Sequence, residues 1–115
     1  MLLPTLLAAA VLGVTPQGEY AAARDAAIRS GRPLLVLVGA TWCGPCQKAK
    51  AFGPALRLRG VVVALDIDRD AEAAAYHVKS VPALIVHERT AAGGWKPPKC
   101  YIGLDAIAAF AKGPR

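Results

Sequence analysis

Two apolar runs dominate the hydrophobic pattern of this 115-residue chain, the first unbroken and the second interrupted only by an Asp near its end. Residues 34–38 (LLVLV) and 61–67 (VVVALDI) lack the polar–apolar alternation of a half-exposed strand. Such runs are typical of strands that are buried on both faces, as in a parallel sheet covered by helices. Two shorter strands are predicted at residues 83–87 and 99–102, and a loop that contains Gly and Pro, residues 88–98, joins them.

Helical patterns alternate with these strands, and the predicted helices cover residues 19–30, 45–52, 71–76 and 105–112. Gly31 and Pro33 end the first helix. Gly53-Pro54 interrupts the second, and a short segment then leads to Gly60. Asp70 is placed to cap the third helix with its side chain.

The order of these elements predicts an α/β fold. A strand–helix–strand unit with a right-handed crossover comes first, and a hairpin followed by a helix comes second. A central, four- to five-stranded mixed sheet flanked by helices on both faces satisfies this order. The sequence shows no internal repeat and no linker, so we expect a single domain over residues 16–115 behind an apolar leader, residues 1–15.

The leader contains a continuous apolar stretch, residues 2–14, that is too short to cross a membrane. It has the length of the apolar region of a secretory signal peptide, and it offers small residues for cleavage at residues 8–10 or in the part that ends at Gly13. No Lys or Arg precedes it. This absence argues against a signal peptide, but all the elements of the predicted fold lie after Thr15 and leave the leader surplus. We therefore expect a signal peptide and an exported, periplasmic or envelope protein. The alternatives are a folded first element or a membrane anchor, and a cytoplasmic location.

Composition and charge narrow the function classes. The formal net charge is +6, but the basic residues are scattered and no dense run or aromatic interleaving accompanies them. Nucleic-acid binding is not expected, because a phosphate footprint needs a clustered basic patch. The chain has three cysteines, which cannot all pair internally, so a disulfide scaffold is not expected either.

Cys43 and Cys46 are the main chemical feature of the sequence, separated only by Gly44 and Pro45. Thiol–disulfide exchange needs one thiolate to attack and a second thiol nearby to resolve the mixed disulfide. Pro45 suits the first turn of a helix. Cys43 would then lie at the helix N-terminus, where free N–H groups stabilise a thiolate. We expect Cys43 to be the more exposed nucleophile and Cys46 the more buried resolving thiol.

A zinc site is the alternative for the cysteine pair, with Cys100, His77 or His87 as further ligands. The spacing is poor, because no second Cys-x-x-Cys or His-x-x-x-His is present, so no metal is expected. Cys100 is predicted to be a half-buried residue of the last strand, with a regulatory or intermolecular thiol as its alternative. The two histidines are expected to have no catalytic role.

The pentapeptide Trp42–Cys46 (WCGPC) resembles the active-site signature of the thioredoxin family. Val81-Pro82 resembles the cis-proline dipeptide of that family, and Gly103 resembles its glycine near the substrate-binding surface. Residues 65–68 (LDID) resemble its strand that ends in an acidic residue. The resemblance covers roughly residues 19–112.

The resemblance implies the thioredoxin fold and a monomeric thiol–disulfide oxidoreductase. Its substrate would be a protein disulfide, its electron donor a reductase, and its only redox group the Cys43–Cys46 pair, with no other cofactor. Trp42 would cover the site. A cis Pro82 would hold the backbone at Val81 for pairing with an extended substrate segment and keep a metal-binding side chain out of that position.

Gly44-Pro45 resembles the reducing members of the family, whose potentials lie near about −270 mV. Two alternatives remain open. One is an exported thiol oxidase or isomerase. The other is a non-catalytic module that holds an extended peptide beside Pro82.

The chain departs from the family pattern at two positions. Many thioredoxins carry a buried Asp where this chain has Leu37, and a Lys where it has Ala64. The loss of the Asp removes a buried charge that is costly to desolvate, and also a candidate general base for Cys46. We expect water to substitute, with slower resolution by Cys46 and a specialised partner.

Overall fold

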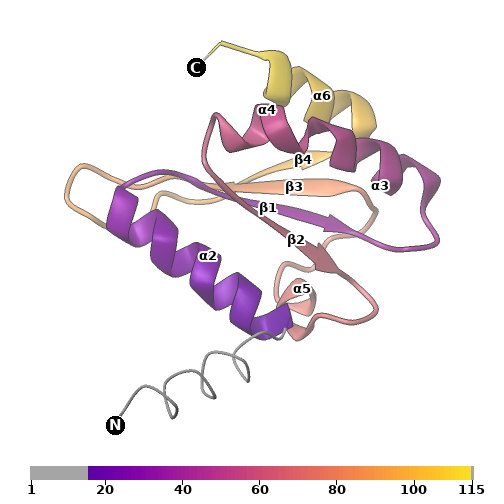
Figure 1. Ribbon diagram of the computed structural model, residues 1–115, viewed down its shortest axis with the longest axis horizontal. Helices are drawn as coiled ribbons and strands as arrows, with labels where there is room; N and C mark the ends of the chain where they lie inside the picture. The colour runs from indigo at the N-terminus through magenta and orange to yellow at the C-terminus, as the bar shows by residue number, and fades with distance from the viewer. Residues whose placement is uncertain (1–15, 115) are drawn as a thin grey trace, which may run out of the picture.

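A four-stranded sheet in the order β2-β1-β3-β4 forms the centre of the computed structural model, which describes residues 16–114 (Figure 1). The strands are β1 (Leu34–Gly39), β2 (Val61–Asp66), β3 (Ala83–His87) and β4 (Lys99–Ile102). β1 pairs in parallel with β2 and antiparallel with β3, and β4 pairs antiparallel with β3. The predicted mixed sheet is therefore confirmed, with four strands.

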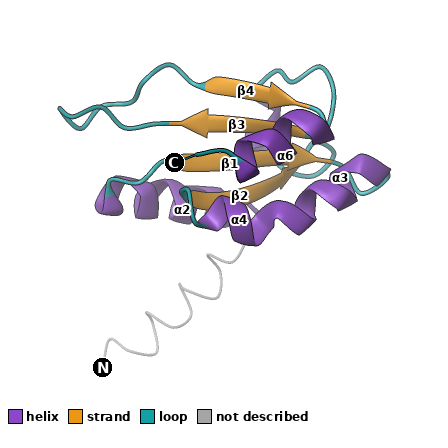
Figure 2. Ribbon diagram, turned by 90° about the horizontal axis from the view of Figure 1, so that it is seen from above, coloured by secondary structure: helices purple, strands orange, loops and turns teal. Residues whose placement is uncertain are grey.

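Helices cover both faces of the sheet. They are α2 (Pro16–Ser30), α3 (Gly44–Ala49), the 3₁₀ turn η1 (Lys50–Phe52), α4 (Gly53–Arg57), α5 (Ala71–Ala74) and α6 (Leu104–Lys112). α2 and α5 lie on one face (Figure 1), and α3, α4 and α6 lie on the other (Figures 1 and 2). The predicted helix order is correct, although α2 begins before residue 19 and α6 begins one residue early.

The central strand β1 divides the core into two clusters. Val36 and Val38 face α2 and α5, whereas Leu35 and Leu37 face α3, α4 and α6. All five residues 34–38 are buried. The sequence prediction of a strand buried on both faces is confirmed for β1, because this strand has neighbours on both edges and helices on both faces.

The same prediction was wrong for β2. Only Val63 and Leu65 of this strand are buried, Ala64 is exposed, and Ile67 lies beyond the strand end with 38% of its surface exposed. β2 is an edge strand that pairs with β1 alone. Side chains of β2 are therefore buried only where a helix packs over that face of the sheet, as at Val63 and Leu65.

Two helix boundaries also differ from the sequence expectation. Gly53-Pro54 does not end the helical stretch, because η1 leads directly into α4 and Pro54 occupies the first turn of α4, where its missing N–H costs nothing. Asp70 stands at the N-cap position of α5, but its side chain does not cap the helix. The Asp70 carboxylate is buried and instead accepts the backbone N–H of Asp66 at 2.8 Å.

A hydrogen-bonded aromatic cluster ties α2 to the end of β3. The Tyr20 and Tyr76 hydroxyl oxygens lie 2.7 Å apart, and the Tyr76 hydroxyl lies 2.9 Å from His87 Nε2. Burial lowers the pKa of His87, with a further contribution from the Arg24 charge, because the protonated ring is poorly solvated there. Burial and the Tyr20 hydrogen bond raise the pKa of Tyr76.

The two-sided burial of β1 predicts a large effect for Leu35→Ala. Leu35 is fully buried, so its truncation should lower the free energy of unfolding by about 2–5 kcal/mol. Leu58→Ala is the matched control, because Leu58 is 61% exposed and should change stability by less than about 0.5 kcal/mol. Urea unfolding of the oxidised protein measures both, and equal losses for the two variants would contradict this packing.

His87 predicts a pH dependence of stability. Its folded-state pKa lies below the ordinary value of 6.5, so the unfolded chain binds more protons as the pH falls towards and below 6.5. The urea midpoint should therefore fall between about pH 7 and pH 5, and His87→Gln should flatten that dependence. His77→Asn, at an exposed position with φ +52°, should leave the dependence in place.

Candidate active site

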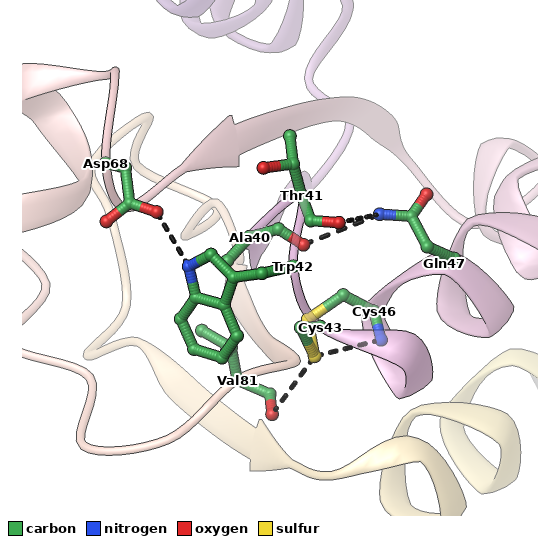
Figure 3. The surroundings of a disulfide bond; sticks show 8 residues. All are labelled: Ala40, Thr41, Trp42, Cys43, Cys46, Gln47, Asp68 and Val81. Atoms are coloured by element: carbon green, nitrogen blue, oxygen red, sulfur yellow. Dashed lines mark hydrogen bonds between the residues drawn. A yellow bond between two sulfur atoms is a disulfide. The ribbon is translucent and has the colours of Figure 1, made fainter.

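The Cys43–Cys46 disulfide lies just beyond the carboxyl end of β1, where α3 begins (Figure 3). Cys43 is the N-cap residue of α3, in extended conformation with φ −96° and ψ 112°. Its Sγ accepts the backbone N–H of Cys46 at 3.2 Å. Gly44 opens the helix and Pro45 occupies its first turn, as the sequence predicts.

Both sulfurs belong to buried residues. Cys43 has 7% of its surface exposed and Cys46 has 3%, so the predicted order holds, although the difference is small. Gly39 contributes to the burial of Cys46. A Cβ at position 39 would lie 3.3 Å from the Cys46 Sγ, which is tighter than an ordinary contact, so the close approach of α3 to β1 depends on this glycine.

The Val81–Pro82 peptide bond is cis, as the sequence resemblance implies. The Val81 carbonyl oxygen lies 3.8 Å from the Cys43 Sγ (Figure 3). Gly103, with φ +92°, donates its N–H to the Pro82 carbonyl at 2.8 Å. The fold thus brings together the three separate sequence features and places the Val81 carbonyl beside the disulfide.

Trp42 is 69% exposed and its indole points towards Asp68 (Figure 3). The indole Nε1–H donates to the Asp68 Oδ2 at 2.8 Å. This hydrogen bond orients the ring at the rim of the site, so Trp42 is not a boundary packing residue. Asp68 was not singled out as a site residue, although the acidic end of the run 65–68 was the available signal.

A groove of about 350 Å³ lies beside the cysteines, and it combines apolar side chains with one positive charge. Its lining residues are Trp42, Ile67, Val78, Lys79, Ser80 and Val81. Because the Val81 carbonyl oxygen lies 3.8 Å from the Cys43 Sγ, one wall of the groove borders the disulfide. An extended polypeptide with an apolar side chain fits this chemistry.

A second, smaller cavity of about 50 Å³ lies behind Cys46. Leu37 and Ala64, which are register partners between β1 and β2, both line it. Asp66, Lys50 and Arg69 line it as well. Apolar and charged side chains thus share the lining of this cavity with the resolving cysteine.

Cys100, which the sequence offers as a further zinc ligand, lies on β4. Cys100 is exposed, so the expected half-buried position was wrong, because β4 is an edge strand. Partial desolvation raises the pKa of its thiol above the ordinary value of 9.0. Among residues 16–114, no group of three or more His, Cys, Asp or Glu side chains is placed to hold a metal ion.

The predicted leader, residues 1–15, lies outside the described residues. Within residues 16–114, no helix is both long enough and apolar enough to cross a membrane. The expectation of a signal peptide or anchor therefore stays a prediction.

The chain is similar to known proteins both in its sequence and in its fold. A family model described as thioredoxin-like matches residues 15–87. The thioredoxin of Streptomyces clavuligerus is 35% identical over 87 residues, which cover 72% of this chain and 77% of that protein. The structure of Trichomonas vaginalis thioredoxin superposes with a TM-score of 0.61 and 29% identity, covering 82% of this chain and 88% of that one.

The bifunctional thioredoxin reductase/thioredoxin of Mycobacterium leprae is 33% identical over 106 residues. That match covers 85% of this chain but only 21% of the longer protein. The similarity thus extends over nearly all of this chain and over a small part of its relative.

Proposed function

The chain belongs to the thioredoxin-like family, and from this membership and the Cys43–Cys46 disulfide we propose that it is a thiol–disulfide oxidoreductase that reduces protein disulfides. The observation that carries the proposal is the position of the Cys43 sulfur. It lies at the start of α3, within 3.8 Å of the Val81 carbonyl that precedes the cis proline. A nucleophilic sulfur and a main-chain docking segment therefore share one surface.

Cys43 carries out the first step. In the reduced protein its thiolate attacks one sulfur of the substrate disulfide, a new S–S bond forms, and the other substrate sulfur leaves as a thiolate. The Cys46 N–H, which lies 3.2 Å from the Cys43 Sγ, stabilises the negative charge before attack. The N-terminal end of α3 adds to that stabilisation.

Cys46 carries out the second step. Its thiolate attacks the Cys43 sulfur of the mixed disulfide, the Cys43–Cys46 bond forms, and the second substrate thiolate is released. The substrate gains two electrons and the protein loses two. The disulfide form of the structure is the product of this step, and no cofactor beyond this cysteine pair is required.

A reductase must then return two electrons to the cysteine pair. The name of the M. leprae relative, a bifunctional thioredoxin reductase/thioredoxin, supports a reductase of that kind as the electron donor. The groove next to Trp42 and Val81 would hold the substrate, an extended protein segment that carries the disulfide. Main-chain groups at Val81 would pair with that segment, with Gly103 leaving room beside Pro82.

The reducing direction is favoured by Gly44 and Pro45, since no cationic side chain lies between the cysteines to stabilise the thiolate form further. An exported oxidase or isomerase would use the same two cysteines. A peptide-binding module would use the groove alone.

Replacement of either active-site cysteine should separate the two steps. Cys43→Ser should abolish the reduction of insulin disulfides by dithiothreitol, because no nucleophile remains, with a rate loss of more than about 100-fold. Cys46→Ser should instead accumulate a mixed disulfide between Cys43 and the substrate, visible by mass spectrometry.

Cys100→Ser is the matched control, because Cys100 is an exposed thiol outside the site, and it should retain the full rate. Unchanged insulin reduction by Cys43→Ser would contradict the proposed function. Peptide binding that survives replacement of both Cys43 and Cys46, without catalysis by the intact chain, would favour the binding module.

The reduction potential of the Cys43–Cys46 pair should distinguish reductase from oxidase. We expect a value near about −270 mV, measured by equilibration with glutathione or dithiothreitol buffers and thiol trapping. A potential above about −200 mV would contradict the reducing direction and support an oxidase or isomerase.

A further inference from the structure

The resolving step of the proposed function requires Cys46 to lose a proton. A thiol is a poor nucleophile, and the free thiol of cysteine ionises near about pH 8.5. Cys46 has only 3% of its surface exposed, so bulk water has limited access to its sulfur. A proton acceptor close to Cys46 would therefore speed resolution near neutral pH.

The register between β1 and β2 places Asp66 opposite the glycine that contacts this sulfur. Gly39 and Asp66 are paired residues of the parallel ladder. Paired residues of neighbouring strands lie about 4.8 Å apart and direct their side chains to the same face of the sheet. The face of Gly39 is the one that meets Cys46, since a Cβ there would lie 3.3 Å from the Cys46 Sγ.

The Asp66 carboxylate is held near the end of β2 by its neighbours. The Asp66 Oδ1 accepts the backbone N–H of Asp68 at 2.8 Å, and the Asp66 N–H donates to the Asp70 Oδ2 at 2.8 Å. The Asp68 bond limits the freedom of the side chain and employs one carboxylate oxygen, and the Asp70 bond holds the Asp66 backbone. Within residues 16–114 the second carboxylate oxygen accepts no hydrogen bond, and Asp66 lines the cavity behind Cys46.

The cavity behind Cys46 joins the two groups. Cys46 and Asp66 both line it, and its volume of about 50 Å³ exceeds the 10–15 Å³ or so that one water requires. Lys50 from η1 and Arg69 from the turn after β2 also line the cavity, and Arg69 pairs with Asp70 at 3.5 Å. Leu37 and Ala64 supply its apolar side, so Asp66 is the proton acceptor among its lining side chains.

We propose that Asp66, through a water in this cavity, accepts the proton of Cys46 during resolution of the mixed disulfide. The inference rests on the proposed function and names a further residue of the same site. Lys50 and Arg69 lie on the same cavity and favour the negative charge that develops on the Cys46 sulfur.

The Cys46 S–H bond breaks and its proton passes through the water to the Asp66 carboxylate. The Cys46 thiolate forms the bond to the Cys43 sulfur, and the substrate sulfur leaves with the electron pair of the broken disulfide. Asp66 then returns its proton to solvent, and the released thiolate takes one up. No oxidant or reductant beyond the substrate disulfide is needed.

Asp66→Asn tests the proposal in a Cys100→Ser background. The amide cannot accept the thiol proton, but its oxygen still accepts the Asp68 N–H. The reduced protein is mixed rapidly with dithiobis(nitrobenzoate), which releases one coloured thiolate on attack by Cys43 and a second on resolution by Cys46. Asp66→Asn should slow the second release about tenfold near neutral pH and leave the first unchanged.

The pH profile separates this role from a structural one. The deficit of Asp66→Asn should shrink at alkaline pH, because solvent hydroxide can then take the thiol proton directly. Asp25→Asn is the matched control, because it removes an exposed carboxylate from α2 on the opposite face of the sheet and should change neither release. A second release that matches the Asp25→Asn control within twofold or so at every pH would overturn the proposal.

Two further measurements keep the test decisive if Asp66→Asn fails to fold. Asp66→Ser retains a hydrogen-bond acceptor for the Asp68 N–H and should show the same selective loss. In the chain that keeps Asp66, the second thiolate should be released below about pH 7 faster than the shrinking fraction of ionised thiol alone would allow. If the rate of the second release instead fell strictly about tenfold per pH unit in this range, a role for Asp66 would be refuted. If Cys43→Ser left insulin reduction intact, the proposed function itself would fail. If Cys43→Ser abolished insulin reduction but Asp66→Asn released the second thiolate at the control rate at every pH, only the role of Asp66 would be rejected.

Discussion

The burial of β1 on both faces is the constraint on which the rest of this structure depends. Residues 34–38 have helices above and below them and a paired strand on each edge, so each side chain contributes to one of two cores. Burial of apolar surface is the main favourable term in folding, and here it fixes one strand in the middle of the molecule. The carboxyl end of that strand is consequently a rigid platform, and the Cys43–Cys46 segment begins directly on it.

The chemistry at this platform depends on main chain as much as on side chains. Cys43 faces the Cys46 N–H and the Val81 carbonyl, and Gly103 bonds to Pro82 behind them. These groups come from segments far apart in the sequence and meet at one end of the sheet. Under the proposed function, a site built from backbone groups would accept varied substrate sequences, whereas the groove with Trp42 and Lys79 would add a preference for particular side chains.

The surroundings of Cys46 differ from those of Cys43. Leu37 is buried and apolar, and its register partner Ala64 is small, so a cavity forms between the resolving cysteine and the edge of the sheet. A charged pair at these positions would have needed costly desolvation beneath α3. Charged groups instead stand at the solvent edge, at Asp66, Lys50 and Arg69, where water shares their solvation. This arrangement lets the protein keep an apolar layer under α3 and still place a carboxylate near the buried sulfur.

The sequence by itself determined the order of the helices and strands, the two-sided burial of β1 and the identity of the cysteine pair. These features follow from local signals: an uninterrupted hydrophobic run, glycine and proline positions, and a specific short motif. The cis Val81–Pro82 bond was implied by the resemblance to the thioredoxin family and not by a local signal. Only the tertiary structure decided that β2 and β4 are edge strands, which exposes Ala64 and Cys100. It also decided that Asp70 bonds to Asp66 instead of capping α5, that Trp42 bonds to Asp68, and that Asp66 lies opposite Gly39. The physical reason is that hydrophobicity reports how much a segment gains from burial, whereas its partners are set by long-range strand pairing and by competition among hydrogen-bond acceptors.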